Sequence, residues 1–339
     1  MRIAHLLLSR GFAGTERATA EMCNAHARDH AVLAILRSGH RGAGGASIRD
    51  HLDPAVQVIE MGPWWQRRAV SGALASFNPQ IVHAHLRRAT RLLAHIQPRA
   101  PAIATLHLTV NGPHFAAMEG LICIAAWQRR DLPPGYRGRV FDINESMIPA
   151  RRLEPAEIAA LRAELGVASG DYLIGGVGRL ARSKGFDLLI EAFERAALPT
   201  ARLVILGDGR ERARLARQAR AAGERVQLAG YRAEVKDYYQ AFDLFVCSSR
   251  REPLGRVVLE ALDAGTPVLA SATDGPAELL ARHGGDLVPI GDVAALAVRL
   301  RHHFETRTAR TAHDLSAYHI DTVARETLAA YRELTDKRY

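Results

Sequence analysis

The sequence predicts an α/β protein made of two doubly wound parallel-sheet domains that face each other across a cleft. Short apolar runs rich in Val, Ile and Leu alternate with segments of helical period along most of the chain, a pattern typical of parallel strands covered by helices on both faces. The length of 339 residues suits about two domains. The strand pattern also stops between residues 144 and 157, where two prolines appear and a new helix opens.

The first half of the chain supplies seven expected strands with helices between several of them, and one of these helices runs from Thr15 to His26. The strands are expected at residues 2–8, 32–36, 56–61, 80–85, 102–107, 121–125 and 140–144. We assign this half, residues 1–146, to an N-terminal domain.

The second half repeats the strand and helix order over residues 147–317, which we assign to a C-terminal domain. Its strands are expected at residues 171–178, 201–207, 225–230, 243–248, 266–271 and 285–290, and its helices to begin near Lys184, Arg210, Val235, Gly255 and Pro276. Residues 318–339 have the pattern of one helix with no strand after it. We expect this helix to cross back to the N-terminal domain.

The cysteine spacing and the first residues of the sequence indicate in which cellular compartment the protein is expected. Cys23, Cys123 and Cys247 are widely spaced and form no C-x-x-C pair, which argues against a disulfide scaffold or a zinc site and suits a reducing cytoplasm. The apolar run after Met1 is about six residues long, far below the roughly 20 that a spanning helix needs. We therefore expect a cytoplasmic protein.

The net charge of +9 is concentrated in the first half. Residues 1–150 hold 17 Arg and Lys against 10 Asp and Glu, whereas residues 151–339 hold 28 against 26. A basic domain beside a nearly neutral one suggests an anionic partner, either nucleic acid or an acidic membrane. Because the sequence has no zinc finger, RNA-binding aromatic signature or long basic block, we do not expect nucleic acid.

Three basic stretches with aromatic residues favour the membrane. The segment "GPWWQRRAVSG" joins Trp64 and Trp65 to Arg67 and Arg68, and "HLRRATRLL" and "AAWQRRDLPPGYRGR" add further arginines. Such mixtures anchor proteins at the surface of anionic bilayers. The alternative is a helix end that packs its Trp into the core and leaves its arginines solvated. We expect peripheral contact at the inner face of the plasma membrane.

Glycine-bearing turns follow three expected strands: "SRGFAGTERAT" with Gly11 and Gly14, "GGVGRLARSKGFDLLIEAF", and "LGDGRERARL". None matches a dinucleotide fingerprint well, so no NAD or FAD cofactor is expected. In the second turn Arg179 and Lys184 flank a loop between a strand end and a helix start, where a diphosphate could lie. The alternative is a pair of solvated loop charges.

Glu252 and Glu260 lie eight residues apart in "RREPLGRVVLEALDAGTPVLAS". A glycosidase pair would need carboxyl groups about 5 to 10 Å apart, whereas eight helical residues rise about 12 Å. Pro253 and Gly255 indicate that the helix begins after Glu252. The spacing therefore suits two contacts to different ends of an elongated ligand, with ordinary surface acids as the alternative.

These segments carry a resemblance to a known family. The stretch "EPLGRVVLEALDAGTPVLAS" resembles the E-x7-E segment of family 4 retaining glycosyltransferases of the GT-B fold, which has two Rossmann-like domains. The pieces "GVGRLARSKGFDLLIEAF", "LVILGDGRERARL" and "VQLAGYRAEVKDYYQAFDLFVCSS" precede it in the family's order. "GTERAT", "IVHAHL" and "TLH" extend the likeness, more loosely, to the first half.

The resemblance implies a site for a nucleotide-sugar donor. Glu252 would contact the donor sugar, Glu260 the ribose, and Arg179 and Lys184 the diphosphate. The other donor-binding residues it implies are Gly14, Gly230, Tyr231, Leu254 and Gly255. His107 of "TLH" would lie beside the reacting centre, so that Glu252, His107, Arg179 and Lys184 form the expected catalytic set. His83 and His85 have either a role at the acceptor or a structural one.

The activity implied is transfer of a hexosyl residue, with retention and without a metal or cofactor. UDP-sugar is the favoured donor and GDP-sugar the second, and the acceptor is a lipid-linked or lipopolysaccharide-type saccharide. The alternatives are a nucleotide-sugar epimerase of the same fold and a non-catalytic sugar-nucleotide-binding partner. The sequence departs from the family at Ala13, where a second glycine is usual, and at Arg250 and Arg251, which are either solvated or paired with an anionic ligand.

Overall fold

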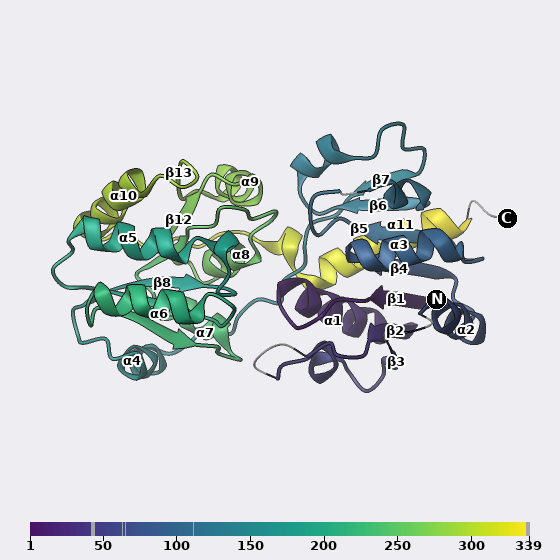
Figure 1. Ribbon diagram of the computed structural model, residues 1–339, viewed down its shortest axis with the longest axis horizontal. Coiled ribbons are helices and arrows are strands. Elements are labelled where there is room, and N and C mark those ends of the chain that lie inside the picture. Colours follow the sequence, from purple (N-terminus) through teal and green to yellow (C-terminus); the bar gives the residue numbers. More distant parts are fainter. Residues whose placement is uncertain (42–44, 63, 65, 111, 337–339) are drawn as a thin grey trace. The chain divides into compact units, whose positions relative to one another are not determined.

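The computed structural model describes residues 1–41, 45–62, 64, 66–110 and 112–336, and it divides into two compact units (Figure 1). The first unit holds Met1–Ile148 and Ser316–Tyr339, and the second holds Pro149–Leu315. The sequence places these boundaries after residues 146 and 317. Helix α11 (Ile320–Asp336) belongs to the first unit, where it packs against α1 (Gly14–Ala27).

The first unit is built on a seven-stranded parallel sheet in the order β3-β2-β1-β4-β5-β6-β7. The strands are β1 (Arg2–Leu7), β2 (Ala31–Arg37), β3 (Gln57–Met61), β4 (Ile81–His85), β5 (Ala102–Thr105), β6 (Gly120–Cys123) and β7 (Arg139–Asp142). The other helices are α2 (Gln66–Phe77), α3 (Leu86–Ile96) and the short η1 (Ile48–His51), η2 (Pro113–Ala117), η3 (Ala126–Asp131) and η5 (Ser316–Tyr318).

Alternating side chains of the first sheet fill two cores, one on each face. Ile35 of β2 packs with Leu74 of α2 and Leu93 of α3. Its neighbour Leu36 packs on the opposite face with Cys23 of α1. Helices α2 and α3 therefore cover one face of the sheet, and α1 with α11 covers the other, as expected for a doubly wound sheet (Figure 1).

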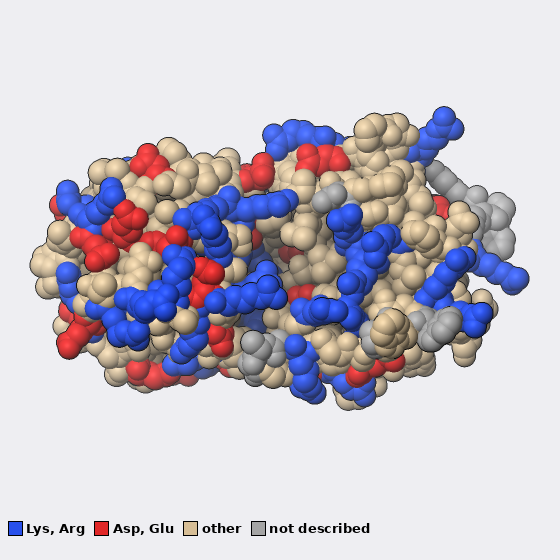
Figure 2. Space-filling model, in the orientation of Figure 1, with Lys and Arg blue, Asp and Glu red and all other residues tan. Residues whose placement is uncertain are grey.

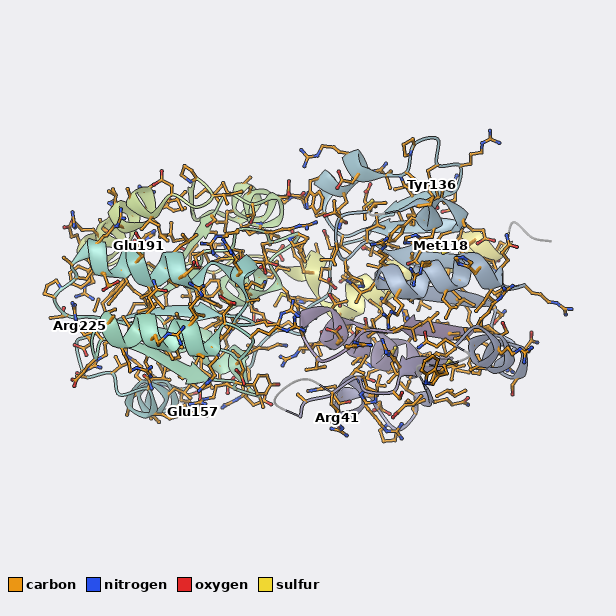
Figure 3. All side chains as sticks on the ribbon, in the orientation of Figure 1. Arg41, Met118, Tyr136, Glu157, Glu191 and Arg225 are labelled. Carbon is orange, nitrogen blue, oxygen red and sulfur yellow. The ribbon has the colours of Figure 1, made fainter. Side chains whose placement is uncertain are left out.

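A tyrosine fastens the loop that leads into β7 at the edge of this sheet. Tyr136 donates its hydroxyl to the carbonyl oxygen of Met118 at 2.9 Å (Figure 3). A Cβ on Gly138 would lie 2.2 Å from the Tyr136 hydroxyl. A glycine at position 138 is what lets the ring reach back to this carbonyl.

The second unit contains a six-stranded parallel sheet in the order β10-β9-β8-β11-β12-β13. Its strands are β8 (Tyr172–Val177), β9 (Ala201–Leu206), β10 (Val226–Gly230), β11 (Leu244–Cys247), β12 (Val268–Ser271) and β13 (Asp286–Val288). Its helices are α4 (Pro155–Glu164), η4 (Arg182–Lys184), α5 (Phe186–Ala196), α6 (Arg212–Ala221), α7 (Val235–Ala241), α8 (Arg256–Asp263), α9 (Asp274–His283) and α10 (Val293–Thr306).

The predicted fold class of two doubly wound parallel sheets is confirmed. Every strand in the described part of the chain begins and ends within two residues of its expected range. Helix α10 was not predicted; it follows β13 and packs on α5 in the core of the second unit. No helix of the described residues is both long enough and apolar enough to span a bilayer.

Candidate functional site

A glycine-rich turn after β8 positions the two expected cations of the second unit. Arg179 lies two residues beyond the strand, and Lys184 ends η4 just before α5. Gly185 has a φ of +66°, and a Cβ there would lie 2.0 Å from the carbonyl oxygen of Ser248. A glycine is therefore required where this turn meets the end of β11.

The two cations differ in their surroundings. Lys184 Nζ forms an ion pair with Glu252 Oε2, which also accepts a hydrogen bond from Ser249 Oγ at 3.2 Å. Arg179 is exposed, and it has no ion-pair or hydrogen-bond partner among the residues that the structure describes. Of these two cations, Lys184 is thus neutralised and Arg179 is open to a ligand.

Glu252 lies in the loop that enters α8, and 8% of it is exposed. Its carbonyl oxygen accepts a hydrogen bond at 3.1 Å from the backbone amide of Gly275, near the start of α9. A Cβ on Gly275 would lie 2.3 Å from the Cα of Leu254. Sequence reasoning missed Gly275, although the pair Gly275-Pro276 at a helix start was a visible signal.

Glu260 is the fifth residue of α8, about a turn and a half inside the helix as its spacing predicts. Its carboxylate accepts a hydrogen bond from Tyr239 Oη at 2.9 Å and lies 3.6 Å from Arg256 Nε. Only 7% of Glu260 is exposed. Each glutamate is therefore buried and held by partners of its own, which is unusual for ordinary surface acids.

The other residues of the second unit that we expect to bind the donor lie at or after strand ends. Gly230 ends β10 with a φ of +79°, and Tyr231 after it is 43% exposed. Leu254 is buried, and Gly255, with a φ of +87°, directly precedes α8. Because the strands are parallel, residues that follow β8, β10 and β11 share one edge of the sheet, the edge at which α/β proteins bind ligands.

Arg250 corrects an expectation. Its guanidinium is neither solvated nor left for a ligand, because its two terminal nitrogens bind Asp187 Oδ1 and Oδ2 at 2.7 and 2.9 Å. Although burial opposes ionisation of Asp187, the hydrogen bonds from Arg250 hold the pKa of this carboxyl below its ordinary value. Arg250 therefore fastens the loop before Glu252 to the first turn of α5.

Gly14 and His107, the two expected site residues of the first unit, lie near strand ends. Gly14 is the first residue of α1, and the backbone amide of Ala13 before it donates to Glu16 Oε2 at 2.9 Å. His107 follows β5 and is 8% exposed. The remaining predicted residues, Arg179, Lys184, Gly230, Tyr231, Glu252, Leu254, Gly255 and Glu260, all belong to the second unit.

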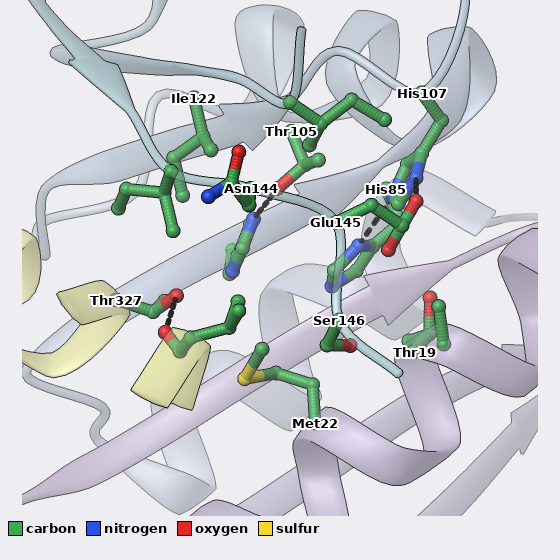
Figure 4. Close-up of a pocket in the computed structure, with 15 residues that line it drawn as sticks. Thr19, Met22, His85, Thr105, His107, Ile122, Asn144, Glu145, Ser146 and Thr327 are labelled. Carbon is green, nitrogen blue, oxygen red and sulfur yellow. Dashed lines mark hydrogen bonds and ion pairs between the residues drawn. The ribbon is translucent and has the colours of Figure 1, made fainter. Parts of the chain in front are cut away.

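His107 ends a chain of four hydrogen-bonded histidines that continues through His85 and His5 to His26 of α1. Figure 4 shows the end formed by His85 and His107. The ring nitrogens of His107 and His85 are 3.0 Å apart, as are those of His85 and His5, and those of His5 and His26 are 3.4 Å apart. At one end His26 Nε2 lies 3.4 Å from the carbonyl oxygen of Ala324. At the other, His107 Nδ1 lies 3.4 Å from Glu145 Oε2 beside a cavity of about 30 Å³.

One carbonyl group sets the direction of this chain. The oxygen of Ala324 can only accept, so His26 Nε2 carries the proton and its Nδ1 accepts from His5. Burial lowers the pKa of His26 to about 4 and those of His5 and His85 well below the ordinary value, so all three rings are neutral. His5 Nε2 then donates to His26 Nδ1, His85 Nε2 to His5 Nδ1, and His107 Nε2 to His85 Nδ1. His107 Nδ1 faces Glu145 but forms no hydrogen bond among the described residues.

His5, His83 and His85 also bring ring nitrogens within 4.8 Å of one another, as a metal site would require. His83 is hydrogen-bonded to Tyr331 Oη at 2.6 Å and to Thr105 Oγ1 at 2.7 Å. The chain already engages both nitrogens of His5 and His85. An ion would have to replace these hydrogen bonds, so the geometry favours a structural role for His83 and His85.

Comparison with known proteins identifies the relatives of this chain. Residues 157–320 match the family Glycosyl transferases group 1. The chain is 37% identical over 186 residues to the lipopolysaccharide core biosynthesis glycosyltransferase LpsE of Rhizobium meliloti (strain 1021), covering 52% of this chain and 54% of that protein. It is 36% identical over 309 residues to a GDP-mannose-dependent alpha-mannosyltransferase of Mycobacterium tuberculosis (strain CDC 1551 / Oshkosh), covering 82% and 76% respectively.

A solved structure shares the fold over the whole chain. The crystal structure of Anabaena Alr3699/HepE in complex with UDP-glucose superimposes with a TM-score of 0.79 at 23% identity, and the match covers 100% of this chain and 99% of that one. The two Rossmann-like sheets therefore have the GT-B architecture that the resemblance implied.

Proposed function

Because the chain belongs to the family Glycosyl transferases group 1, we propose that it is a retaining hexosyltransferase that uses a nucleoside diphosphate sugar. The proposed acceptor is a lipid-linked or lipopolysaccharide-type saccharide, in line with the name of the LpsE relative. UDP-sugar is the favoured donor. GDP-sugar is the second candidate, and the name of the mannosyltransferase supports it.

The observation that carries the proposal is the difference between Lys184, which is paired with Glu252, and Arg179, which has no partner among the described residues. A departing nucleoside diphosphate develops negative charge, and Arg179 is a permanently charged cation without a carboxylate to neutralise it among the described residues. Lys184 is held by Glu252 until a diphosphate competes for it. Two such side chains can take the place of a divalent metal, so we propose metal-independent transfer.

This competition gives Glu252 its role in the proposal. Once Lys184 turns to the diphosphate, the Glu252 carboxylate accepts hydrogen bonds from hydroxyls of the donor sugar. Glu260 binds the ribose hydroxyls deeper in α8, and Gly230 and Tyr231 lie near the base. The amides around Leu254 and Gly255, where α8 begins, help to hold the phosphates.

The first unit serves the acceptor in this proposal. Gly14 begins α1 and approaches the donor, while His107 acts beside the reacting centre with its Nδ1 toward Glu145. Peripheral contact with the inner face of the plasma membrane brings a lipid-linked acceptor to this unit. Trp64, which is 80% exposed, supports such a contact, whereas Trp65 lies outside the described residues.

The direct test is turnover with two donors. UDP-glucose and GDP-mannose are each incubated with the protein and a purified lipopolysaccharide acceptor in the presence of EDTA, and the product is analysed by mass spectrometry and NMR. We expect a gain of one hexose with the donor's anomeric configuration, and no product from Lys184→Met. An inverted product, or turnover that EDTA abolishes, contradicts the retaining or the metal-independent part of the proposal.

Incubation with donor alone separates the rivals. An epimerase converts free nucleotide sugar without an acceptor, whereas the proposed transferase leaves the sugar configuration unchanged. A non-catalytic partner binds nucleotide without turnover of any acceptor. Vesicle cosedimentation tests the membrane contact: we expect binding to anionic vesicles that declines with salt, and recovery that is equal with neutral vesicles argues against it.

A further inference from the structure

A pocket on the α2 and α3 face of the first unit brings together arginines that the sequence distributes over three segments. It has a volume of about 570 Å³ and lies between the end of β2, the start of α2 and one side of α3. The lining residues are Arg37, Gln66, Arg67, Arg88, Arg91, Leu92 and His95. None of them is acidic, and Figure 2 shows Lys and Arg side chains over the region of α2 and α3.

Arg37 is the unusual member of this lining. Leu33 and Ile35 point from β2 into the core beneath α2 and α3, so the alternation of the strand turns Arg37 to the same face. Arg37 is 8% exposed, and its Nη1 is buried without a hydrogen-bond partner among the described residues. A buried guanidinium without a counter-charge is strongly unfavourable, so the position indicates that an anion completes the site.

The carboxylate of the neighbouring strand β3 is used elsewhere. Glu60 sits on β3 beside Leu36 rather than Arg37, so it faces the opposite side of the sheet, where it pairs with Arg49 and His40. Arg67, Arg88 and Arg91 form no ion pair with any carboxylate in the part of the chain that the structure describes. The pocket therefore carries several positive charges that no carboxylate of the described residues neutralises.

We propose that Arg37, Arg67, Arg88 and Arg91 bind a phosphate group that is attached to a saccharide. A phosphate monoester carries nearly two negative charges and three acceptor oxygens, which suits several guanidinium groups better than a single carboxylate does. The pocket is several times larger than a phosphate, so it has room for the sugar that bears it. Since the second unit is proposed to take the donor, this phosphosaccharide is the acceptor, a step that rests on the proposed function.

The burial of Arg37 separates this proposal from a lipid surface. Arg67, Arg88 and Arg91 are exposed and could all touch the headgroups of a flat bilayer. Arg37 is too deeply buried for that contact, but a phosphate that enters the pocket can reach its guanidinium. A variant at position 37 therefore distinguishes a ligand in the pocket from a membrane outside it.

The test uses glucose 6-phosphate as the probe and glucose as the neutral control, at constant ionic strength and without donor. Binding is measured by thermal unfolding and calorimetry in an Arg179→Gln background, which removes the cation of the second unit that is open to a ligand. We expect glucose 6-phosphate, but not glucose, to raise Tm. Arg37→Met should lower the affinity at least about tenfold and raise the Tm of the unliganded protein, because it removes an uncompensated buried charge.

Two further variants keep the test decisive. Arg88→Gln changes an exposed side chain, so the variant should fold normally. It should still reduce the rise in Tm that glucose 6-phosphate produces. Arg28→Gln removes one charge from an exposed pair with Asp321 outside the pocket and should leave the response unchanged. The proposal is overturned if glucose 6-phosphate does not bind, if Arg28→Gln weakens it as much as Arg88→Gln, or if Arg37→Met lowers the unliganded Tm and retains the response.

Vesicles containing phosphatidylglycerol provide the last arm. We expect Arg37→Met to bind them as wild type does. Loss of vesicle binding in this variant, with no response to glucose 6-phosphate in the parent protein, would assign the pocket to a lipid headgroup and overturn the proposal. Because the assay needs no turnover, its failure is distinct from failure of the transferase proposal, which the donor assays measure.

Discussion

The second unit builds its candidate site from charges, whereas the first unit builds its own from neutral rings. In the second, Lys184 and Glu252 are paired, and Arg179 of the same turn has no partner among the described residues. In the first, His26 and His85 belong to a chain whose order is set by a carbonyl oxygen rather than by a counter-charge. Both sites lie within doubly wound parallel sheets, so the fold does not dictate the difference.

This difference between the two units shows that the degree of burial determines whether neutral or charged polar side chains can be accommodated. His5 and His85 are almost fully enclosed, and burial keeps their pKa values well below the ordinary value. Neutral rings with satisfied hydrogen bonds cost little there. Lys184 and Glu252 lie nearer the surface at a loop, where a charged pair can form and later exchange partners. A charged site should therefore respond to substitution through turnover, and a neutral one through stability.

The largest effect is expected at the charged site. Glu252→Gln removes the charge that holds Lys184 and replaces one carboxylate oxygen by an amide nitrogen, which cannot accept a hydrogen bond from the donor sugar. Turnover should therefore fall on the order of 10²–10³-fold while nucleotide affinity is retained. Steady-state kinetics and calorimetry with UDP and GDP measure the two quantities. Glu157→Gln, which removes an exposed carboxylate paired with Arg151, is the matched control. Wild-type turnover in Glu252→Gln would remove the residue from the mechanism.

The neutral site should respond to acid. The pKa of His26 is lowered from 6.5 to about 4 in the folded protein, so below pH 6.5 the unfolded chain binds the proton more readily. The contribution of neutral His26 to the free energy of unfolding is complete above pH 6.5. It is lost as the pH falls toward 4, by up to about 3 kcal/mol. Urea unfolding between pH 7 and pH 4 measures the slope of the free energy of unfolding against pH. His26→Leu should flatten it, whereas the exposed His302→Gln should not; an unchanged slope in His26→Leu contradicts a buried neutral His26.

Glu260 tests whether the two glutamates act separately. Glu260→Ala should weaken nucleotide binding about tenfold, roughly 1.4 kcal/mol, and leave turnover at saturating donor nearly unchanged. Tyr239→Phe is the matched control, because it removes only the hydrogen bond that holds the carboxylate and should have a smaller effect in the same direction. If Glu260→Ala instead lowers turnover and spares affinity, the assignments of the two glutamates are reversed.

The sequence predicted the strands well and the partners of polar residues poorly. The strands were readable because buried parallel strands are continuous apolar runs, as in β8 and β11. The positions of Glu252 and Glu260 followed from Pro253 and Gly255, which mark a helix start. By contrast, the pair of Arg250 with Asp187 joins residues 63 apart in the chain.

The histidine chain and the arginine pocket were hidden for the same reason. His26 and His85 come from a helix and a strand that only the folded sheet brings together. The basic stretches at Arg67 and Arg88 suggested a flat membrane surface, and nothing local indicated that Arg37 would lie beside them. Strand alternation after Leu33 and Ile35 was the available signal for its inward direction.

The smallest effect is expected where a charged pair only fastens a loop. Asp187→Asn keeps one of the two hydrogen bonds to Arg250, so the free energy of unfolding should fall by about 1 kcal/mol at pH 7. Because Arg250 lowers the pKa of Asp187 in the folded state, this contribution is present above the unfolded pKa and is lost as the pH falls through the folded one. The free energies of unfolding of the variant and the wild type should therefore become equal in strong acid. Glu191→Gln, which breaks the exposed pair with Arg195 on α5 (Figure 3), should change stability by less than about 0.5 kcal/mol, and an equal loss in both variants would show that Arg250 is no better fastened than a surface arginine.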